Sequence, residues 1–188
     1  MNERKSGIIT DKAGVRILKP YEFELLIRGI PKLENRTKFK MLMFTGMRYA
    51  EAKALYKNKD WFTGDGIKVP STKKKAVQKE RWVILTSQAR TAVEYYLEGN
   101  SGLPHQVNWI DNLKRWANYA GIGDEGMSSK TTRKTWESWL IATNKDSLKV
   151  CVSQGHTQLT SLEYYVTIPF SNADKQAMAK YTEDWGEI

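Results

Sequence analysis

The fold is read most directly from Thr45-Gly46-Met47-Arg48-Tyr49-Ala50-Glu51-Ala52-Lys53-Ala54-Leu55. Gly46 suits the left-handed C-cap of a helix, because glycine lacks the Cβ that makes this conformation costly. We therefore expect a helix from about Asn35 to Gly46 and a new helix from Arg48 to Leu55. An arginine directly after a glycine-capped helix end lies where the backbone and the guanidinium group can both face a pocket.

The patterns on either side of this stretch predict an α+β protein that is mainly α. Pro20 opens the first helix, and Glu22 and Glu24 in its first turn favour a helix N-terminus. After Leu55 the pattern changes to short strands around turns, so we expect a small antiparallel β-sheet inserted after the third helix. The predicted strands are 61–62, 67–69 and 81–85, and further helices are expected at 87–97, 105–120, 129–143, 146–154, 160–166 and 171–185.

The length and composition suit a single globular domain. The chain has 188 residues, of which 40% are hydrophobic and 27% charged, and it contains no internal repeat or low-complexity linker. Residues 1–19 are polar and irregular until Val15-Arg16-Ile17-Leu18. We expect a basic N-terminal arm over residues 1–19 and one domain over residues 20–188, without a separate domain before it.

The net charge indicates a polyanionic partner. Thirty Lys and Arg residues against 21 Asp and Glu give a formal charge of +9. Such an excess favours double-stranded DNA or another nucleic acid, because basic side chains that neutralise phosphates release condensed counterions. A surface that is merely made soluble by its charge is the alternative.

Several other classes of site are disfavoured. The single cysteine, Cys151, excludes an intramolecular disulfide, fits a reducing interior and lies in an apolar run typical of a buried residue. The two histidines have no partners at metal-ligand spacing, so we expect neither a metal nor a cofactor. The sequence has no apolar stretch of about 20 residues and no signal-peptide pattern at its start. We expect an intracellular protein of the cytoplasm or nucleoid.

Two further motifs follow in the C-terminal half. The first is Lys130-Thr131-Thr132-Arg133, and the second is Gly155-His156 with Tyr164-Tyr165 downstream. Together with Thr45-Gly46-x-Arg48-x-x-Glu51-x-x-x-Leu55 and the strand–basic loop–strand segment, they resemble the catalytic domain of the tyrosine recombinases, the phage-integrase family. The resemblance covers about residues 20–170. Each motif is short, but the ordered set is specific.

This resemblance implies a site-specific DNA recombinase or integrase that works through a 3′-phosphotyrosyl intermediate. It implies Tyr165 as the nucleophile, Arg48 and Arg133 as cations around the phosphate, and His156 as a hydrogen-bond partner of the scissile phosphate. Covalent catalysis divides one hard step into two easier ones. Guanidinium forks suit the charge of a pentacoordinate phosphorane, and no metal-bound hydroxide is needed because no water is consumed.

Each of these residues also has a plainer interpretation. Arg48 could pair with Glu51 or Glu22, Arg133 could lie on a solvated helix face, and His156 could cap a helix. Tyr164 is the rival nucleophile; neighbouring helical positions point about 100° apart, so only one tyrosine reaches a given pocket.

The lysines divide into two groups. The resemblance selects Lys73 as the donor of a proton to the leaving 5′ oxygen, although a shift of one residue would select Lys74; we expect Lys74, Lys75 and Lys79 to contact DNA. Lys130 stands where the family usually has histidine. An ammonium donates rather than accepts protons, so we expect Lys130 to donate to a nonbridging oxygen, and the acceptor of the tyrosine proton stays open. Some archaeal viral and plasmid integrases of the family share Lys-x-x-Arg.

Three functions fit this set of residues. The leading hypothesis is a recombinase that acts as a tetrameric synapse on duplex DNA. A type IB topoisomerase would use the same chemistry as a monomer, and a noncatalytic DNA-binding protein with a decayed recombinase fold would not cleave at all. The amphipathic segment after Pro169 could pack on its own domain or on a neighbouring protomer.

Overall fold

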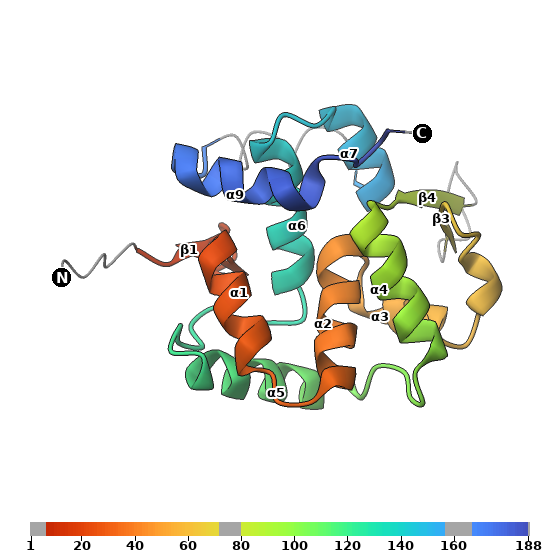
Figure 1. The fold of residues 1–188 in the computed structure, drawn as a ribbon, viewed down its shortest axis with the longest axis horizontal. Helices are drawn as coiled ribbons and strands as arrows, with labels where there is room; N and C mark the ends of the chain where they lie inside the picture. The colour runs from red at the N-terminus through yellow and green to blue at the C-terminus, as the bar shows by residue number, and fades with distance from the viewer. Residues whose placement is uncertain (1–6, 72–79, 157–166, 188) are drawn as a thin grey trace.

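The computed structural model describes residues 7–71, 80–156 and 167–187 (Figure 1). The elements before the larger hairpin are β1 Ile9–Thr10, β2 Arg16–Ile17, α1 Pro20–Gly29, α2 Leu33–Thr45, α3 Tyr49–Leu55 and a 3-10 turn at Lys59–Trp61. They are followed by β3 Gly66–Pro70, β4 Glu80–Ile84, α4 Ser87–Glu98, α5 Gln106–Tyr119, α6 Thr131–Ala142, α7 Ser147–Gln154 and α9 Asn172–Thr182.

Helix α2 is the centre of the packing, with α4 and α6 beside it (Figure 1). The last five residues of α2, from Met41 to Thr45, are all buried. A helix that is apolar on every side is surrounded by other elements. The left-handed C-cap expected at Gly46 is confirmed, with φ of 60°, so the chain leaves α2 at the end that is buried most deeply.

An aromatic cluster joins four helices around the core. The ring of Phe23 on α1 lies 5.5 Å from Phe44 on α2, 5.6 Å from Trp139 on α6 and 5.4 Å from Tyr181 on α9. Because Tyr181 belongs to this cluster, α9 packs on its own domain. The other tryptophans of helical spacing are buried as well: Trp109, Trp116 and Trp136.

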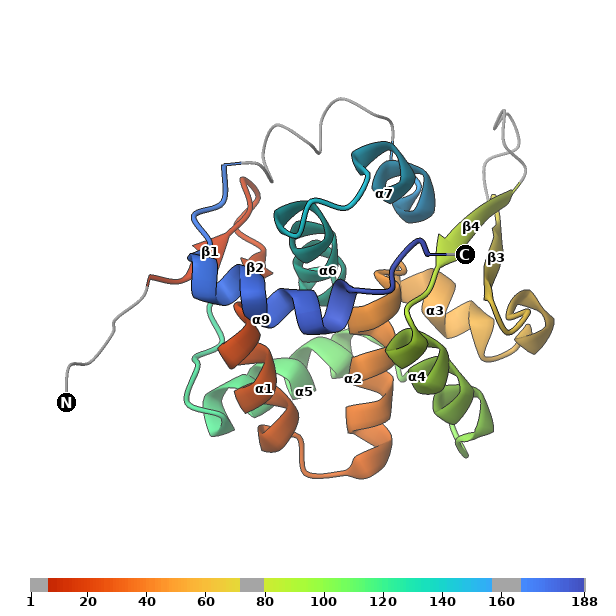
Figure 2. The ribbon, with the colours of Figure 1, turned by 45° about the horizontal axis from the view of Figure 1, so that its top comes forward.

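The predicted sheet after the third helix is confirmed as the antiparallel hairpin β3–β4. Its register pairs Ile67 with Val83, and both side chains are fully buried. The first of the expected strands is different, because Trp61 ends the 3-10 turn and Phe62 forms only an isolated bridge to Ile67. Figure 2 shows α7 between β4 and α6, so the hairpin and the C-terminal helices meet at one side of the molecule.

The structure differs from the expectation of an irregular segment before Pro20. The short hairpin β1–β2 packs against α6. Asp11 forms its turn by accepting the backbone amides of Ala13 and Val15 at 2.9 Å each. Arg16 is buried and donates to Glu22 at 2.5 Å, which attaches the hairpin to the first turn of α1. Residues 9–18 therefore belong to the folded unit.

The remaining helix predictions are confirmed within about three residues at each boundary. The helix expected at 160–166 lies outside the described residues. Across the described ranges, every helix is too short or too polar to cross a lipid bilayer.

Candidate functional site

Arg48 lies at the junction of α2 and α3, where it is the N-cap of α3. Its backbone amide donates to Glu51 Oε2 at 2.9 Å, and its Nη1 lies 2.8 Å from Glu51 Oε1. The ion pair with Glu51 that was the plainer interpretation is therefore present. Arg48 Nη2 also donates to the carbonyl of Gly155 at 3.0 Å, and the side chain is about half exposed at 48%. Arg48 thus joins the start of α3 to the end of α7 and still faces solvent.

Arg133 comes from the first turn of α6 and is buried. Its Nη1 donates to the carbonyl of Gly46 at 2.8 Å, and its Nη2 donates to the carbonyl of Gln154. The solvated helix face considered above is wrong for this residue. Burial, followed by the positive charge of Arg48, lowers the pKa of Arg133 to about 10, so the guanidinium group stays cationic at neutral pH.

His156 follows the left-handed C-cap Gly155 of α7, and its backbone amide donates to the carbonyl of Cys151 at 2.9 Å. Its Nε2 lies 2.9 Å from Nη2 of Arg133 and 3.1 Å from Oε2 of Glu137. The structure therefore brings together Arg48, Arg133 and His156, which stand far apart in the sequence.

Arg81 on β4 is part of the same site, although no sequence motif singled it out. Its Nη2 pairs with Glu51 Oε2, and its Nη1 donates to the carbonyl of Ser153 at 2.9 Å. A Cβ at Gly155 would lie only 2.7 Å from Cδ and Nε of Arg81, so a glycine is needed for this approach. A signal existed: strand alternation puts Arg81 on the face of the buried Val83, where arginine is unusual.

Glu137 is the second residue that was missed. It is fully buried on α6, one turn after Arg133. Its sequence signal is a carboxylate inside the run Trp136-Glu137-Ser138-Trp139-Leu140, because acidic residues are almost never fully buried unless they are paired.

The other predicted site residues are placed less completely. Lys130 is the exposed N-cap of α6, three residues before Arg133 and so on the same side of the helix. The remaining predicted residues lie outside the described residues: Lys73, Lys74, Lys75, Lys79, Tyr164 and Tyr165. The ends of β3 and β4, Pro70 and Glu80, flank the segment with the lysines.

The charges of the site favour an anion. The site holds three guanidinium groups, from Arg48, Arg81 and Arg133, and two carboxylates. Arg48 and Arg81 pair with Glu51, and Glu137 lies beside His156, so the guanidinium groups outnumber the carboxylates. Preorganised cations of this kind stabilise the charge of a phosphoryl transition state. Among the described residues, no group of three or more His, Cys, Asp or Glu side chains could hold a metal ion.

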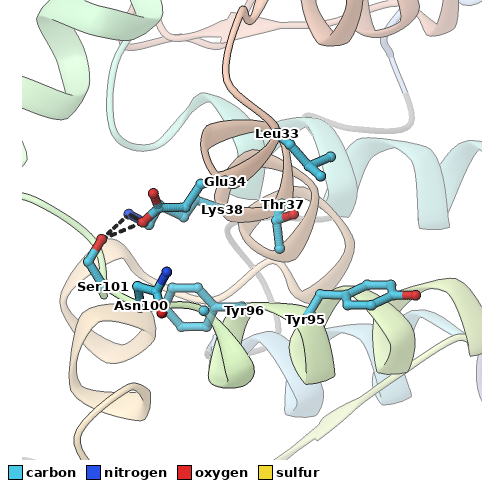
Figure 3. Close-up of a pocket in the computed structure, with 9 residues that line it drawn as sticks. Leu33, Glu34, Thr37, Lys38, Tyr95, Tyr96, Asn100 and Ser101 are labelled. Atoms are coloured by element: carbon cyan, nitrogen blue, oxygen red, sulfur yellow. Dashed lines mark hydrogen bonds and ion pairs between the residues drawn. The ribbon is translucent and has the colours of Figure 1, made fainter.

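A pocket of about 550 Å³ lies at the other end of α2 and contains none of these residues. Figure 3 shows Leu33 and Thr37 on one wall and Tyr95 and Tyr96 of α4 on the other. At its edge Lys38 Nζ donates to Glu34 at 2.7 Å and to Ser101 at 2.8 Å. The first turn of α2 is roughly 18 Å from Gly46 at 1.5 Å per residue, so the pocket is separate from the arginine site.

The fold of the chain is similar to that of solved recombinases. XerA recombinase superimposes with a TM-score of 0.62 at 17% identity, over 87% of this chain and 64% of XerA. The fold is that of a tyrosine-recombinase catalytic domain. XerH site-specific recombinase bound to difH substrate in a pre-cleavage complex gives 0.60 at 21% identity, over 87% of this chain and 53% of XerH.

A post-cleavage complex of XerH with palindromic difH gives a TM-score of 0.59 at 20% identity, over 89% of this chain and 52% of that protein. The chain thus spans about half to two thirds of the length of these recombinases. At the level of sequence, no family model and no curated protein matches the chain. The likeness is one of fold.

Proposed function

We propose that this protein is a site-specific DNA recombinase that cleaves and rejoins duplex DNA through a 3′-phosphotyrosyl intermediate. The observation that carries the proposal is the meeting of Arg48, Arg133 and His156 at the end of α7, on a fold shared with DNA recombinases. Three segments separated by 85 and 23 residues converge on the carbonyls of Gln154 and Gly155. The net charge of +9 agrees with a DNA partner.

The chemistry assigns a role to each side chain. The Tyr165 hydroxyl attacks phosphorus while Arg48 and Arg133 stabilise the charge of the phosphorane, and His156 forms a hydrogen bond with the scissile phosphate. Removal of one preorganised donor typically costs on the order of 10²–10³ in rate. Lys73 protonates the leaving 5′ oxygen, and Lys130 donates to a nonbridging oxygen.

The surroundings of the site belong to the same proposal. Lys74, Lys75 and Lys79 contact the DNA backbone next to the hairpin β3–β4, and residues 20–188 act as the catalytic domain in a tetrameric synapse. The Lys-x-x-Arg motif at Lys130 agrees with the archaeal viral and plasmid integrases.

The test is a suicide DNA substrate whose nick prevents rejoining, with a covalent protein–DNA adduct detected on a denaturing gel. The wild-type protein should form the adduct, Tyr165→Phe should abolish it, and Tyr164→Phe should retain it. The reverse pattern would assign the nucleophile to Tyr164. If neither the wild type nor Tyr164→Phe forms an adduct on any duplex that the protein binds, the catalytic proposal is wrong and a noncatalytic DNA-binding role replaces it.

Relaxation of a supercoiled plasmid without recombination between two sites would instead identify a topoisomerase. The two assays use the same protein preparation and the same tyrosine variants. We expect recombination between paired sites to require Tyr165, Arg48 and Arg133.

A further inference from the structure

Glu137 is a buried ionisable group that the proposed reaction does not use. It has no solvent exposure, and it lies on α6 one turn after Arg133. A buried carboxylate costs several kcal/mol unless hydrogen-bond donors compensate it. A carboxylate kept at this depth beside an anion site requires a reason other than stability.

The contacts of His156 supply that reason. Its Nε2 is within hydrogen-bond distance of both Glu137 Oε2, at 3.1 Å, and Arg133 Nη2, at 2.9 Å. A guanidinium group only donates, and an ionised carboxylate only accepts. If Nε2 carries the proton, it donates to Glu137; if it does not, it accepts from Arg133. The choice between the two partners therefore decides which ring nitrogen of His156 is free.

Several observations favour Glu137 as the partner. Arg133 already donates to the carbonyls of Gly46 and Gln154, so its guanidinium has acceptors without His156. The Glu137 carboxylate is fully buried and gains from every donor.

Few groups of the site can accept a proton. Arg48, Arg81 and Arg133 are donors, and the ammonium of Lys130 is a donor as well. Glu51 is bound by both Arg48 and Arg81. Within the described part of the site, this leaves the imidazole of His156, whose side chain is 22% exposed, with Glu137 buried behind it.

We propose that Glu137 is a positioning residue that holds His156 in the tautomer protonated on Nε2, so that Nδ1 is free to accept the proton of the attacking hydroxyl. The second half of this statement rests on the proposed function. The arrangement follows the general logic of a base oriented by a buried carboxylate. The proposal also supplies a proton acceptor in place of Lys130, which stands where the family usually has histidine. An ammonium group has no lone pair with which to accept a proton.

The proton and electron balance is closed. The O–H bond of the nucleophile breaks as its oxygen bonds to phosphorus, and the proton goes to Nδ1 of His156. The resulting imidazolium still donates a hydrogen bond from Nε2–H to the Glu137 carboxylate. The P–O5′ bond breaks, its electron pair leaves on the 5′ oxygen, and that oxygen takes a proton from the ammonium donor. Rejoining reverses each step.

The test reads the tautomer of His156 directly by long-range ¹H–¹⁵N NMR of the folded protein without DNA. The chain contains only two histidines, His105 and His156, so His105→Gln assigns the signals. The wild type should show Nε2 protonated and Nδ1 not. Glu137→Gln, whose amide oxygen still accepts, should keep this tautomer. Glu137→Met should shift the tautomer ratio toward Nδ1–H by about tenfold, as expected for the loss of a charge-assisted hydrogen bond.

The signals of His105 serve as the internal reference, and Asp111→Asn, an exposed carboxylate on α5, is the matched control for the lost charge. A wild-type spectrum with Nδ1 protonated overturns the proposal without any variant. So does an unchanged His156 tautomer in a folded Glu137→Met protein.

The second measurement is the rate of adduct formation on the suicide substrate. We expect Glu137→Met to lower this rate by a factor on the order of 10², while DNA affinity stays within about twofold. Glu137→Gln should retain much of the wild-type rate. Equal rates in the wild type and Glu137→Met overturn the proton-acceptor role. If the wild type forms no adduct, the proposed function fails, and the NMR comparison still decides whether Glu137 holds His156.

Discussion

At the scale of single residues, the site depends on one carboxylate that serves two arginines. Glu51 pairs with Arg48 at 2.8 Å through one oxygen and with Arg81 through the other. Burial by itself raises the pKa of Glu51, but the charge of Arg81 and the hydrogen bonds from Arg48 outweigh it, so the pKa is lowered. Burial, followed by the charge of Arg48, also lowers the pKa of Arg81, and Glu51 opposes this effect.

This lowered pKa predicts how stability depends on pH. A carboxyl group whose pKa is lower in the folded protein than in the unfolded chain stabilises the fold. This contribution is complete at pH values above the unfolded-state pKa, and it is lost as the pH falls through the folded-state pKa. We expect Glu51→Gln to lower the unfolding temperature near neutral pH. The difference in unfolding temperature between this variant and the wild type should decrease as the pH falls below 4.5, the ordinary pKa of a glutamate side chain.

Thermal unfolding, followed by circular dichroism at several pH values between 3 and 7, measures this difference. The range includes the pKa values of carboxyl groups in model peptides, roughly 3.9–4.3. Asp111→Asn is the control, because it removes the charge of an exposed carboxylate. A Glu51→Gln effect that does not vary with pH would show that the carboxylate charge is irrelevant to folding.

At the scale of elements, the site is assembled at the ends of helices. The C-cap glycines of α2 and α7, Gly46 and Gly155, both have positive φ values, 60° and 68°. Arg48 follows the first of these caps and donates to the carbonyl of the second, Gly155, while the carbonyl of Gly46 accepts from Arg133. The rigid helices hold these ends, while the turns aim the side chains.

Gly46→Ala should therefore destabilise the protein through both strain and collision. A Cβ at this position would lie 2.5 Å from Gln154 Oε1 and 2.8 Å from Trp136 Cδ1. A left-handed conformation costs a non-glycine residue about 1–2 kcal/mol, and overpacking adds about 1–3 kcal/mol.

Gly64→Ala is the matched control, because Gly64 has φ of 90° and no atom within 4 Å of its added Cβ. Urea unfolding should give a larger loss of free energy for Gly46→Ala than for Gly64→Ala. Equal losses would mean that backbone strain alone, and not the contact with α6 and α7, requires glycine at position 46.

At the scale of the whole molecule, the C-terminal residues attach the hairpin β3–β4 and α4 to the rest of the domain. Asp184 accepts from the backbone amide of Ser87 at 2.7 Å and from its hydroxyl at 2.5 Å. Trp185 is buried, and its Nε1 donates to the carbonyl of Ile84 at 3.2 Å. Strand β4, which these contacts hold in place, also carries Arg81. The C-terminal residues therefore stabilise the geometry of the site.

Trp185→Ala should destabilise the protein by about 3–5 kcal/mol, as is typical for removal of a buried aromatic side chain. Leu148→Ala on α7 is the control, since Leu148 is 54% exposed. Chemical denaturation of both variants measures the difference. A Trp185→Ala loss no greater than that of Leu148→Ala would indicate that the chain end contributes little to the fold.

The amino-acid pattern alone was sufficient for the helices, the hairpin after the third helix and the glycine caps, because these features depend on residues within a few positions of each other. The resemblance of the ordered motifs to the tyrosine recombinases also selected Arg48, Arg133 and His156. The hairpin β1–β2 was missed, because its strands of two residues each are too short for a periodic pattern.

Tertiary structure alone decided the electrostatic partners that stand far apart in the sequence. Arg81 reaches Glu51 across 30 residues, and Glu137 reaches His156 across 19. No local pattern encodes such pairs, because the side chains meet only after α6, α7 and β4 have packed together. Local sequence determines where a helix ends and which charges stand near it; the packing of the elements determines which of those charges touch, and so what the site can do.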